Sequence, residues 1–380
     1  MRILISLVGR FHSEEIAKGF KNFNYNIKVI SSYPYFVFKN VLSRKEHQSI
    51  GIIGIINRFN KYFPNKIRNI LNILVHRMVS KKTLKEYKEF PIIIIWSGAA
   101  YDFLKNKNSD INNNVILERG STHIIHQQNL LKKLYNDLNF DFKIENNFLK
   151  REIEEYKLSN YIAIPSNFCK KTFLDNGISE KKLFVNPYGI NLNNFYVKEY
   201  NKHKIKKKLI FCGEASIRKG FYPLLESLNK LSRDKIEIIH VGSVSKEIKK
   251  ILKSNRYDNL KMLGSKKTNE LKNYFYSADA LILPSYEEGM ALVQLQSLAC
   301  GTPIISTIQA GVDDIFGSNE VYLGEKINKI DPTSISETVI NFYDNIEKIN
   351  TYEIFNYVKN NFSIESYSQR YLNFIKKIKP

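Results

Sequence analysis

The stretch of this 380-residue chain that decides its fold reads Pro284-Ser-Tyr-Glu-Glu-Gly-Met-Ala-Leu-Val-Gln-Leu-Gln-Ser-Leu-Ala-Cys-Gly-Thr-Pro303. The apolar run before it predicts a strand, and Gly301 and Pro303 end the helix predicted within it. Gly289 leaves room for a ligand near the backbone, and we expect the N–H groups of Gly289 to Leu292 to point outward at the positive end of the helix dipole. Because ligands of open α/β sheets bind beyond the carboxyl ends of strands, this loop is predicted to bind a diphosphate.

Outward from this stretch, short apolar runs alternate with helical patterns in two series. The runs predicted as strands are Ile3–Val8, Asn26–Ile30, Ile92–Ile95, Val115–Leu117 and Tyr161–Ile164, then Lys208–Cys212, Ile236–Val241, Leu260–Leu263, Ala280–Leu283 and Pro303–Ser306. Strands that alternate with helices predict parallel sheets, so the two series predict an α/β protein with two doubly wound domains. Residues 187–208 combine proline, glycine, asparagines and a basic run, which predicts an exposed linker between the domains.

The composition is strongly basic, with 58 Lys+Arg against 37 Asp+Glu and a formal net charge of +21. AT-rich coding, which favours Lys, Asn and Ile together, is one explanation of this charge. The functional alternatives are an anionic membrane surface, phosphate-bearing substrates and nucleic acid. The sequence shows no nucleic-acid-binding module of the usual kinds, so we predict no nucleic-acid partner.

The cysteines and the apolar runs indicate the compartment. Cys169, Cys212 and Cys300 are far apart and lie in apolar contexts, which favours a reducing compartment without disulfides or a zinc cluster. The first apolar run is too short for a signal peptide, and no run approaches the ~20 apolar residues of a membrane span. We therefore expect a cytoplasmic protein, peripheral on the inner face of the cytoplasmic membrane.

Residues 58–88 stand apart because their cations face a single acidic residue, Glu86. The cations are Arg58, Lys61, Lys66, Arg68, Arg77, Lys81, Lys82, Lys85 and Lys88, and aromatic and aliphatic residues are interleaved with them. Such a basic amphipathic stretch predicts contact with an anionic leaflet or with a phosphate-bearing lipid acceptor. The alternative is an ordinary surface helix whose solvated face is charged.

Glu288 and Gln296 are eight residues apart, about two helical turns, so both side chains can reach one ligand at the helix entrance. By themselves they also fit a plain surface helix. With the residues around them they resemble the donor-site signature of glycosyltransferase family 4, which reads Glu, seven residues, Glu. The resemblance implies that Glu288 contacts the transferred sugar. Gln296 stands where the family has a Glu that holds the ribose diol, and a Gln retains one acceptor and gains donors.

The segment Phe211-Cys-Gly-Glu-Ala-Ser-Ile-Arg-Lys-Gly220 follows the first strand of the second domain and resembles the family's phosphate loop. The resemblance implies that Arg218 and Lys219 neutralise the donor diphosphate, which gains charge as the glycosidic bond breaks. Many relatives carry an Arg directly after the first Gly, where this chain has Glu214, and Arg218 is expected to take over that role. The alternative for two adjacent cations in a basic protein is a solvated face.

In the first domain, the loop Val8–Ser13 resembles the family's first loop, which lines the cleft between the domains. Gly9 would let the backbone approach a ligand, and Arg10 or His12 would meet donor or acceptor. The loop lacks the spacing of a dinucleotide-binding fingerprint.

The segment Leu117–Ile124 resembles a family segment that places a histidine in the cleft near the transferred sugar, and His123 matches that histidine. Glu118, Arg119 and Ser121 are expected to shape this loop or touch the acceptor. A lone histidine is otherwise more often structural.

The resemblance covers nearly the whole chain and implies a GT-B fold, two Rossmann-like domains facing a deep cleft. We expect an acceptor-side domain over residues 1–190, joined by a crossover helix over residues 362–380, and a donor domain over residues 191–361. The predicted catalytic residues are His123, Arg218, Lys219 and Glu288, and the predicted donor-binding residues are Gly213, Gly289, Met290, Ala291, Leu292 and Gln296.

The implied activity is transfer of a sugar, with retention of configuration, from a nucleotide-sugar to a glycan or polyprenyl-linked acceptor in bacterial polysaccharide synthesis. A UDP-sugar is the favoured donor. No metal and no other cofactor is predicted. Two alternatives stay open, a nucleotide-sugar 2-epimerase of GT-B-like fold and a non-catalytic nucleotide-sugar-binding protein.

Overall fold

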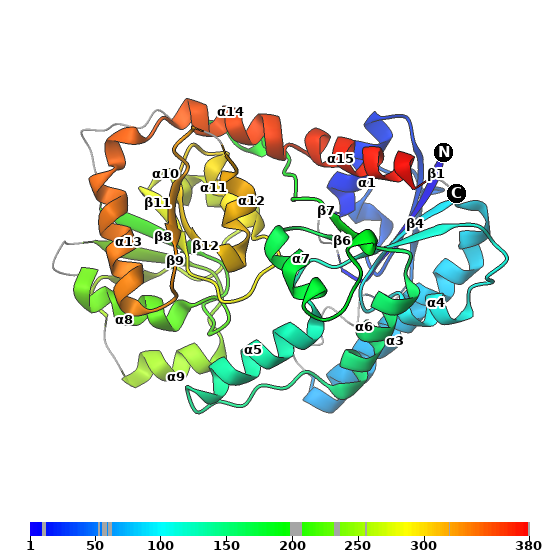
Figure 1. Ribbon diagram of the computed structural model, residues 1–380, viewed down its shortest axis with the longest axis horizontal. Coiled ribbons are helices and arrows are strands. Elements are labelled where there is room, and N and C mark those ends of the chain that lie inside the picture. The colour runs from blue at the N-terminus through cyan, green and yellow to red at the C-terminus, as the bar shows by residue number, and fades with distance from the viewer. Residues whose placement is uncertain are drawn as a thin grey trace.

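The computed structural model describes residues 1–9, 13–51, 54, 59, 63–197, 207–231, 236–254, 257–318 and 320–378 (Figure 1). These residues form two parallel sheets, one of order β3-β2-β1-β4-β5-β6-β7 and one of order β10-β9-β8-β11-β12-β13. In each sheet the chain starts near the middle and switches direction, the pattern of a doubly wound domain. The predicted α/β class with two Rossmann-like domains is confirmed.

The strands of the first sheet are β1 (Arg2–Leu7), β2 (Asn26–Ser31), β3 (His47–Ser49), β4 (Ile92–Trp96), β5 (Asn114–Glu118), β6 (Tyr161–Ile164) and β7 (Leu183–Val185). Those of the second are β8 (Lys208–Cys212), β9 (Glu237–Val241), β10 (Leu260–Met262), β11 (Ala280–Leu283), β12 (Ile304–Thr307) and β13 (Gly324–Ile327). All ten predicted strands are present. The three that sequence reasoning missed, β3, β7 and β13, are short, only partly buried strands at sheet edges, and β3 and β13 also carry polar residues.

Helices cover both faces of each sheet (Figure 1). On the first they are α1 (Ser13–Asn22), α3 (Asn65–Glu86), α4 (Tyr101–Asn106), α5 (Ile124–Asn136), α6 (Asn146–Leu158) and α7 (Asn167–Leu174). On the second they are α8 (Phe221–Leu231), α9 (Lys246–Ser254), α10 (Leu271–Tyr276), α11 (Leu292–Leu298), α12 (Val312–Phe316) and α13 (Pro332–Asp344). The three cysteines are buried and free, and they pack with these cores.

The last two helices link the domains. Helix α14 (Thr351–Phe362) packs on the second domain, and α15 (Ile364–Lys377) crosses to lie beside α1 of the first (Figure 1). Tyr371 of α15 meets Phe20 of α1 edge-on, with ring centroids 5.6 Å apart. The outgoing chain pairs with the returning one through the bridge between Ile190 and Ser363. The predicted crossover helix thus begins two residues later than expected, because Ser363 caps α15 through a bond from the N–H of Ser366.

Helix α3 occupies most of the basic stretch. Val75 and Val79 bury one side of it against the first domain, as an amphipathic helix requires. Its exposed side differs from the expected charged face, because exposed apolar residues lie in its first half and exposed cations lie in its second half. The apolar residues are Ile67, Ile70 and Leu74, and the cations are Arg77, Lys81 and Lys85. Residues Arg58 and Lys61 lie outside the described part of the chain. Among the described residues, no helix is both long and apolar enough to span a membrane.

Candidate active site

The loop after β11 lies where the two domains touch. An ideal Cβ built on Gly289 would be 2.1 Å from the carbonyl oxygen of Gly120 and 2.8 Å from Cγ of Pro165, both in the first domain. The hydroxyl of Ser166 donates to the carbonyl of Gly289 at 2.7 Å. Glycine is therefore required at position 289 by the approach of the other domain's backbone, whereas sequence reasoning attributed it to the approach of a ligand.

Beside this contact a cavity of about 350 Å³ opens between the domains. Gly120 and Tyr188 line it from the first domain, and the β8–α8 loop, the loop after β11 and helix α11 line it from the second. Its lining residues are Gly120, Tyr188, Cys212, Gly213, Lys219, Leu271, Glu288, Met290, Ala291, Leu292, Val293 and Gln296. The structure thus brings together five of the six predicted donor-binding residues, all but Gly289, with Lys219 and Glu288 around one cavity.

The charges of the cavity wall are paired. Lys219 Nζ forms a close ion pair with Glu288 Oε1, and both side chains are mostly buried. The loop that carries Lys219 begins at Gly213, whose φ of +133° is unfavourable for other residues and whose carbonyl oxygen lies 3.0 Å from Nε2 of His240. A cation and a carboxylate side by side can bind a phosphate and a sugar hydroxyl of one ligand, respectively.

The backbone of residues 289–292 is only partly available to a ligand. Helix α11 begins at Leu292, and the N–H of Ala291 donates to the carbonyl of Ala310 at 3.5 Å. The prediction that all N–H groups from Gly289 to Leu292 point outward is therefore wrong for Ala291, because a neighbouring loop already satisfies that group. Met290 and Ala291 contribute apolar surface to the cavity.

Arg218 does not line the cavity, unlike the adjacent Lys219. Its Nη1 donates to the backbone carbonyl of Glu287 at 2.8 Å and lies 3.3 Å from Glu287 Oε2 and 3.2 Å from Glu288 Oε1. The guanidinium therefore bridges two consecutive carboxylates behind the cavity wall. Of these two cations, Lys219 lines the cavity, whereas Arg218 holds the loop that carries Glu288.

Glu287, to which sequence reasoning gave no role, is fully buried at the junction. Its Oε1 accepts bonds from the hydroxyls of Ser121 and Thr122, the latter at 2.7 Å, and its Oε2 accepts from Nε2 of Gln127 at 3.0 Å. Burial acts to raise the pKa of Glu287, but Arg218 and these hydrogen bonds outweigh it and hold the pKa below its ordinary value. The carboxylate is therefore ionised and joins the two domains.

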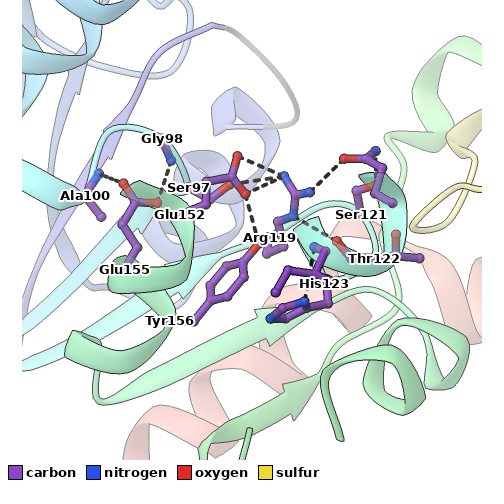
Figure 2. A network of polar contacts seen from close by, with 12 residues as sticks. Ser97, Gly98, Ala100, Arg119, Ser121, Thr122, His123, Glu152, Glu155 and Tyr156 are labelled. Atoms are coloured by element: carbon purple, nitrogen blue, oxygen red, sulfur yellow. Dashed lines mark hydrogen bonds and ion pairs between the residues drawn. The ribbon is translucent and has the colours of Figure 1, made fainter. Parts of the chain in front are cut away.

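Arg119 organises the segment that meets Glu287 (Figure 2). Its Nη1 lies 3.1 Å from Glu152 Oε2, and its Nη2 donates to Oε1 of Gln127 at 3.1 Å. Figure 2 shows the Tyr156 hydroxyl also reaching Glu152, at 2.9 Å. Arg119 thus shapes the loop from inside the first domain, one of the two roles expected for it.

Comparison with known proteins agrees with this geometry. Residues 193–355 match the family described as "Glycosyl transferases group 1". Over 340 residues the chain is 22% identical to an uncharacterized glycosyltransferase of Methanocaldococcus jannaschii, covering 88% of this chain and 84% of the relative. The second domain of the chain thus matches the group 1 glycosyltransferases, and the relative that aligns along most of the chain is also a glycosyltransferase. A Bacillus subtilis glycosyltransferase named for teichuronic acid biosynthesis is 29% identical over 145 residues, 36% of each chain.

Solved glycosyltransferases share the GT-B fold with this one. Sucrose-phosphate synthase from Thermosynechococcus elongatus superposes with a TM-score of 0.71 at 14% identity, covering 99% of this chain and 98% of that one. HepE of Anabaena, in a complex described as containing UDP and glucose, superposes with a TM-score of 0.65 at 13% identity over the full length of both chains. At these identities the likeness establishes the fold.

His123 of this glycosyltransferase lies away from the cavity. It caps α5 by accepting the N–H of Ile125 at Nδ1, it is 2% exposed, and its ring packs 4.9 Å from that of Tyr156 and 5.1 Å from that of Phe173, centroid to centroid. Burial, with Arg119 nearby, lowers the pKa of His123 to about 4, so the imidazole is neutral. Figure 2 shows the His123 ring beside that of Tyr156, and the histidine does not line the cavity but supports the loop.

Two other residues predicted in the enzyme's first domain, Glu118 and Gly9, also lie outside the cavity. Glu118 is buried beside Tyr367 and Tyr371 of α15, where burial raises its pKa to about 7. Gly9 has a φ of +102° and donates its N–H to the Ser32 hydroxyl at 3.3 Å.

Arg10 and His12 lie outside the described residues. Five residues that line the cavity were not among the predicted site residues: Gly120, Tyr188, Cys212, Leu271 and Val293. Gly120, Cys212 and Val293 lie within the matched segments, and Tyr188 follows a proline in the predicted hinge, so these positions carried a signal, whereas Leu271 carried none.

Proposed function

We propose that this glycosyltransferase transfers a sugar from a nucleotide-sugar, with UDP the favoured nucleotide, to a glycan or polyprenyl-linked acceptor in bacterial polysaccharide synthesis. The observation that carries the proposal is the cavity wall that joins Lys219 to Glu288. Lys219 can bind the diphosphate and Glu288 the sugar hydroxyls. The complex of HepE with UDP and glucose supports the choice of nucleotide. The relatives named for teichuronic acid and colanic acid biosynthesis support the choice of pathway.

We propose further that transfer retains the anomeric configuration and needs no metal, as the resemblance to family 4 implies. Glu288 is the one carboxylate among the described residues that line the cavity, and it is paired with Lys219. It is therefore better suited to orient the sugar than to attack it. The bond from the anomeric carbon to the diphosphate breaks with its electron pair on the phosphate oxygen. The acceptor oxygen bonds that carbon on the same face, and its proton passes to the departing diphosphate.

A ligand screen followed by one variant tests the proposal. Thermal shifts with UDP-, GDP- and ADP-sugars identify the nucleotide, and we expect the largest shift with a UDP-sugar. Turnover is then followed with an acceptor extract, with and without EDTA, and Glu288→Ala should lose transfer. Full transfer by Glu288→Ala would contradict the assignment. An epimer formed from the donor alone would favour the epimerase, and binding without turnover on any acceptor would favour the binding protein.

We also propose that α3 holds the enzyme on an anionic membrane, where a lipid-linked acceptor would be found. Its exposed side carries Ile67, Ile70 and Leu74, of which Ile70 is 65% exposed, followed by Arg77, Lys81 and Lys85. The spacings of three and four residues put all six on one side of the helix. Apolar side chains in the acyl boundary and cations among anionic headgroups are the two contributions that bind interfacial helices.

The position of α3 supports a tilted contact near the cleft. Its last turn lies beside the start of β2, where Lys28 Nζ is 2.6 Å from Glu86 Oε2. Its middle lies beside the loop after β4, since an ideal Cβ on Gly98 would be 2.4 Å from Cε1 of His76. The apolar first half therefore extends past the carboxyl edge of the sheet, the edge that carries Gly120 and the cavity. An inserted first half would bring this edge toward the membrane surface.

Vesicle binding tests this part of the proposal. Ile70→Ser/Leu74→Ser should weaken binding to phosphatidylglycerol-containing vesicles by about tenfold or more, since burying one such side chain stabilises by about 1.5–3 kcal/mol. The matched control Leu158→Ser/Ile340→Ser changes two residues of similar exposure elsewhere and should bind like wild type. Equal binding by both double variants, or wild-type binding to neutral vesicles alone, would contradict it. If wild type is a dimer in sedimentation and Ile70→Ser/Leu74→Ser is a monomer, the exposed side of α3 would instead bind a second copy of the chain.

A further inference from the structure

A continuous chain of polar contacts runs from the interior of the first domain to the donor cavity. It begins at Glu152 and Arg119, passes through Gln127 to Glu287, and continues through Arg218 and Glu288 to Lys219. The contacts are 3.1 Å for Glu152–Arg119, 3.1 Å for Arg119–Gln127, 3.0 Å for Gln127–Glu287, 3.3 Å for Glu287–Arg218 and 3.2 Å for Arg218–Glu288, followed by the ion pair of Glu288 with Lys219. Charges alternate in sign along it, with the Gln127 amide as the neutral link.

Glu287 is the member of this chain that crosses the domain boundary. It extends from the donor loop, and its carboxylate accepts bonds from three first-domain side chains, those of Ser121, Thr122 and Gln127. On its own side it meets Arg218. A fully buried carboxylate that accepts hydrogen bonds from the other domain loses them when the domains separate, so these bonds favour the joined arrangement.

The loop held by Glu287 forms the cavity wall on the acceptor side. Gly120, which precedes Ser121, lines the cavity and lies against Gly289. Ser121 and Thr122 fix this loop to the carboxylate, while Arg218 fixes the same carboxylate to the loop of Glu288. One side chain thereby sets the relative position of the first-domain wall and the residue expected to orient the sugar.

We propose that Glu287 is a positioning residue that couples the seating of loop 119–122 to the donor site and excludes water from the bound donor. The proposal rests on the function proposed above, and it adds a residue outside the donor signature to the machinery of transfer. Loop 119–122 then acts as a lid, which is closed when its hydroxyl and N–H groups contact the ionised carboxylate of Glu287. A closed lid gives high transfer and little hydrolysis of the bound nucleotide-sugar. A loosened lid admits water and misaligns the acceptor.

The experiment compares Glu287→Gln with Thr122→Val on the opposite side of the boundary. The amide of Glu287→Gln has the size of the carboxylate, but its NH₂ group faces donors and cannot accept from them. We expect the kcat of transfer to fall about 10- to 100-fold and donor hydrolysis to rise relative to transfer, with the KM for donor within about threefold, because Lys219 and Glu288 remain. Thr122→Val should shift the same ratio in the same direction.

The double variant separates coupling from two independent defects. If one contact is lost in both, Glu287→Gln/Thr122→Val should be no worse than Glu287→Gln alone, whereas independent defects would multiply. Asp314→Asn is the matched control: its carboxylate also joins the domains, through the N–H and Nδ2 of Asn167, but touches no member of the chain. It should leave the ratio of hydrolysis to transfer within about twofold of wild type.

Three results would overturn the inference: an unchanged ratio in Glu287→Gln, multiplied defects in the double variant, or an equal change in Asp314→Asn. If Glu287→Gln does not fold, Thr122→Val and Gln127→Met, which leave the carboxylate in place, decide by the same ratio. A failure of the proposed function is recognised separately, because wild type itself would then neither transfer nor hydrolyse a nucleotide-sugar.

Discussion

Replacing Gly289 with alanine tests whether the enzyme needs the two domains as close as they are in this structure, because it adds one atom, the Cβ, at their contact. The added Cβ would stand 2.1 Å from the Gly120 carbonyl oxygen, while ordinary van der Waals contact begins at 3.4 Å. The two loops must therefore separate by about 1.3 Å. Gly289 is not in the left-handed region, so alanine brings no backbone strain of its own. A misplacement of about 1 Å in an active site costs about 100-fold in rate, and we expect a loss of that order in the kcat of transfer.

The assay measures the kcat of transfer, the KM for the nucleotide-sugar and the melting temperature of Gly289→Ala. We expect the melting temperature to change little, because the clash is relieved by separating two domains that are each intact. Gly177→Ala is the control, since its added Cβ meets nothing within 4 Å but its φ of +80° is strained for alanine. It should lower stability by about 1 kcal/mol and leave kcat unchanged.

Wild-type transfer by Gly289→Ala would refute the reasoning, because it would mean that the enzyme reacts with the domains further apart than in this structure. A fall in melting temperature as large as that of a core cavity, with kcat per folded enzyme unchanged, would also refute it. In that case the glycine would serve the donor domain alone.

Three further predictions concern the cavity and the hinge. Lys219→Met should weaken binding of the nucleoside diphosphate in calorimetry by about 10- to 100-fold, since hydrogen bonds to charged groups contribute about 1.5–3 kcal/mol, and unchanged affinity would remove Lys219 from the phosphate site. Gln296→Glu should tighten donor binding, measured the same way, by giving the ribose a charged acceptor, and weaker binding would show that Gln296 contacts another group. Glu118→Gln should raise unfolding stability at pH 8 by up to about 3 kcal/mol and change it little at pH 4, because burial raises the pKa of Glu118 from 4.5 to about 7 in the folded chain. Between these two values the folded state holds a proton that the unfolded state has lost, so the wild type loses stability as pH rises through this window; equal stability gains at pH 4 and pH 8, in urea titrations, would contradict the assignment.

Much of the fold could be predicted from local sequence, because buried parallel strands consist of consecutive apolar residues. All ten such runs are strands in the structure, and the three missed edge strands are short, two of them with mostly polar residues. His47-Gln-Ser49 in β3 and Gly324-Glu-Lys-Ile327 in β13 resemble loops in isolation. They are strands because their neighbours β2 and β12 supply hydrogen-bonding partners, which no local pattern records.

The clustering of Lys219 and Glu288 around one cavity could also be predicted from the sequence, whereas the position of His123 could not. Lys219 and Glu288 lie in loops that follow strands of one sheet, so sequence order alone brings them together. His123 lies in a matching segment, but its ring turns to Tyr156 and Phe173 because it caps α5, and capping geometry was not part of the motif. Arg218 and Lys219 are adjacent in sequence but make different contacts. The guanidinium of Arg218 bridges two carboxylates, which an ammonium cannot do as well, and Lys219 lines the cavity.

The role of Glu287 could not be inferred locally, and the reason connects the two halves of the site. A carboxylate in a loop is ordinarily solvated, and a second glutamate next to Glu288 gives no separate signal of a role. Its partners Ser121 and Gln127 are more than 150 residues away in sequence, in or next to the segment that resembled the family because of its histidine. Bringing the domains together removes this charge from water, and that burial is stable only because Arg218 and three first-domain donors replace the water. The loop after β11 therefore contains both the residue expected to face the sugar and, one position earlier, the residue whose burial requires the other domain to be present.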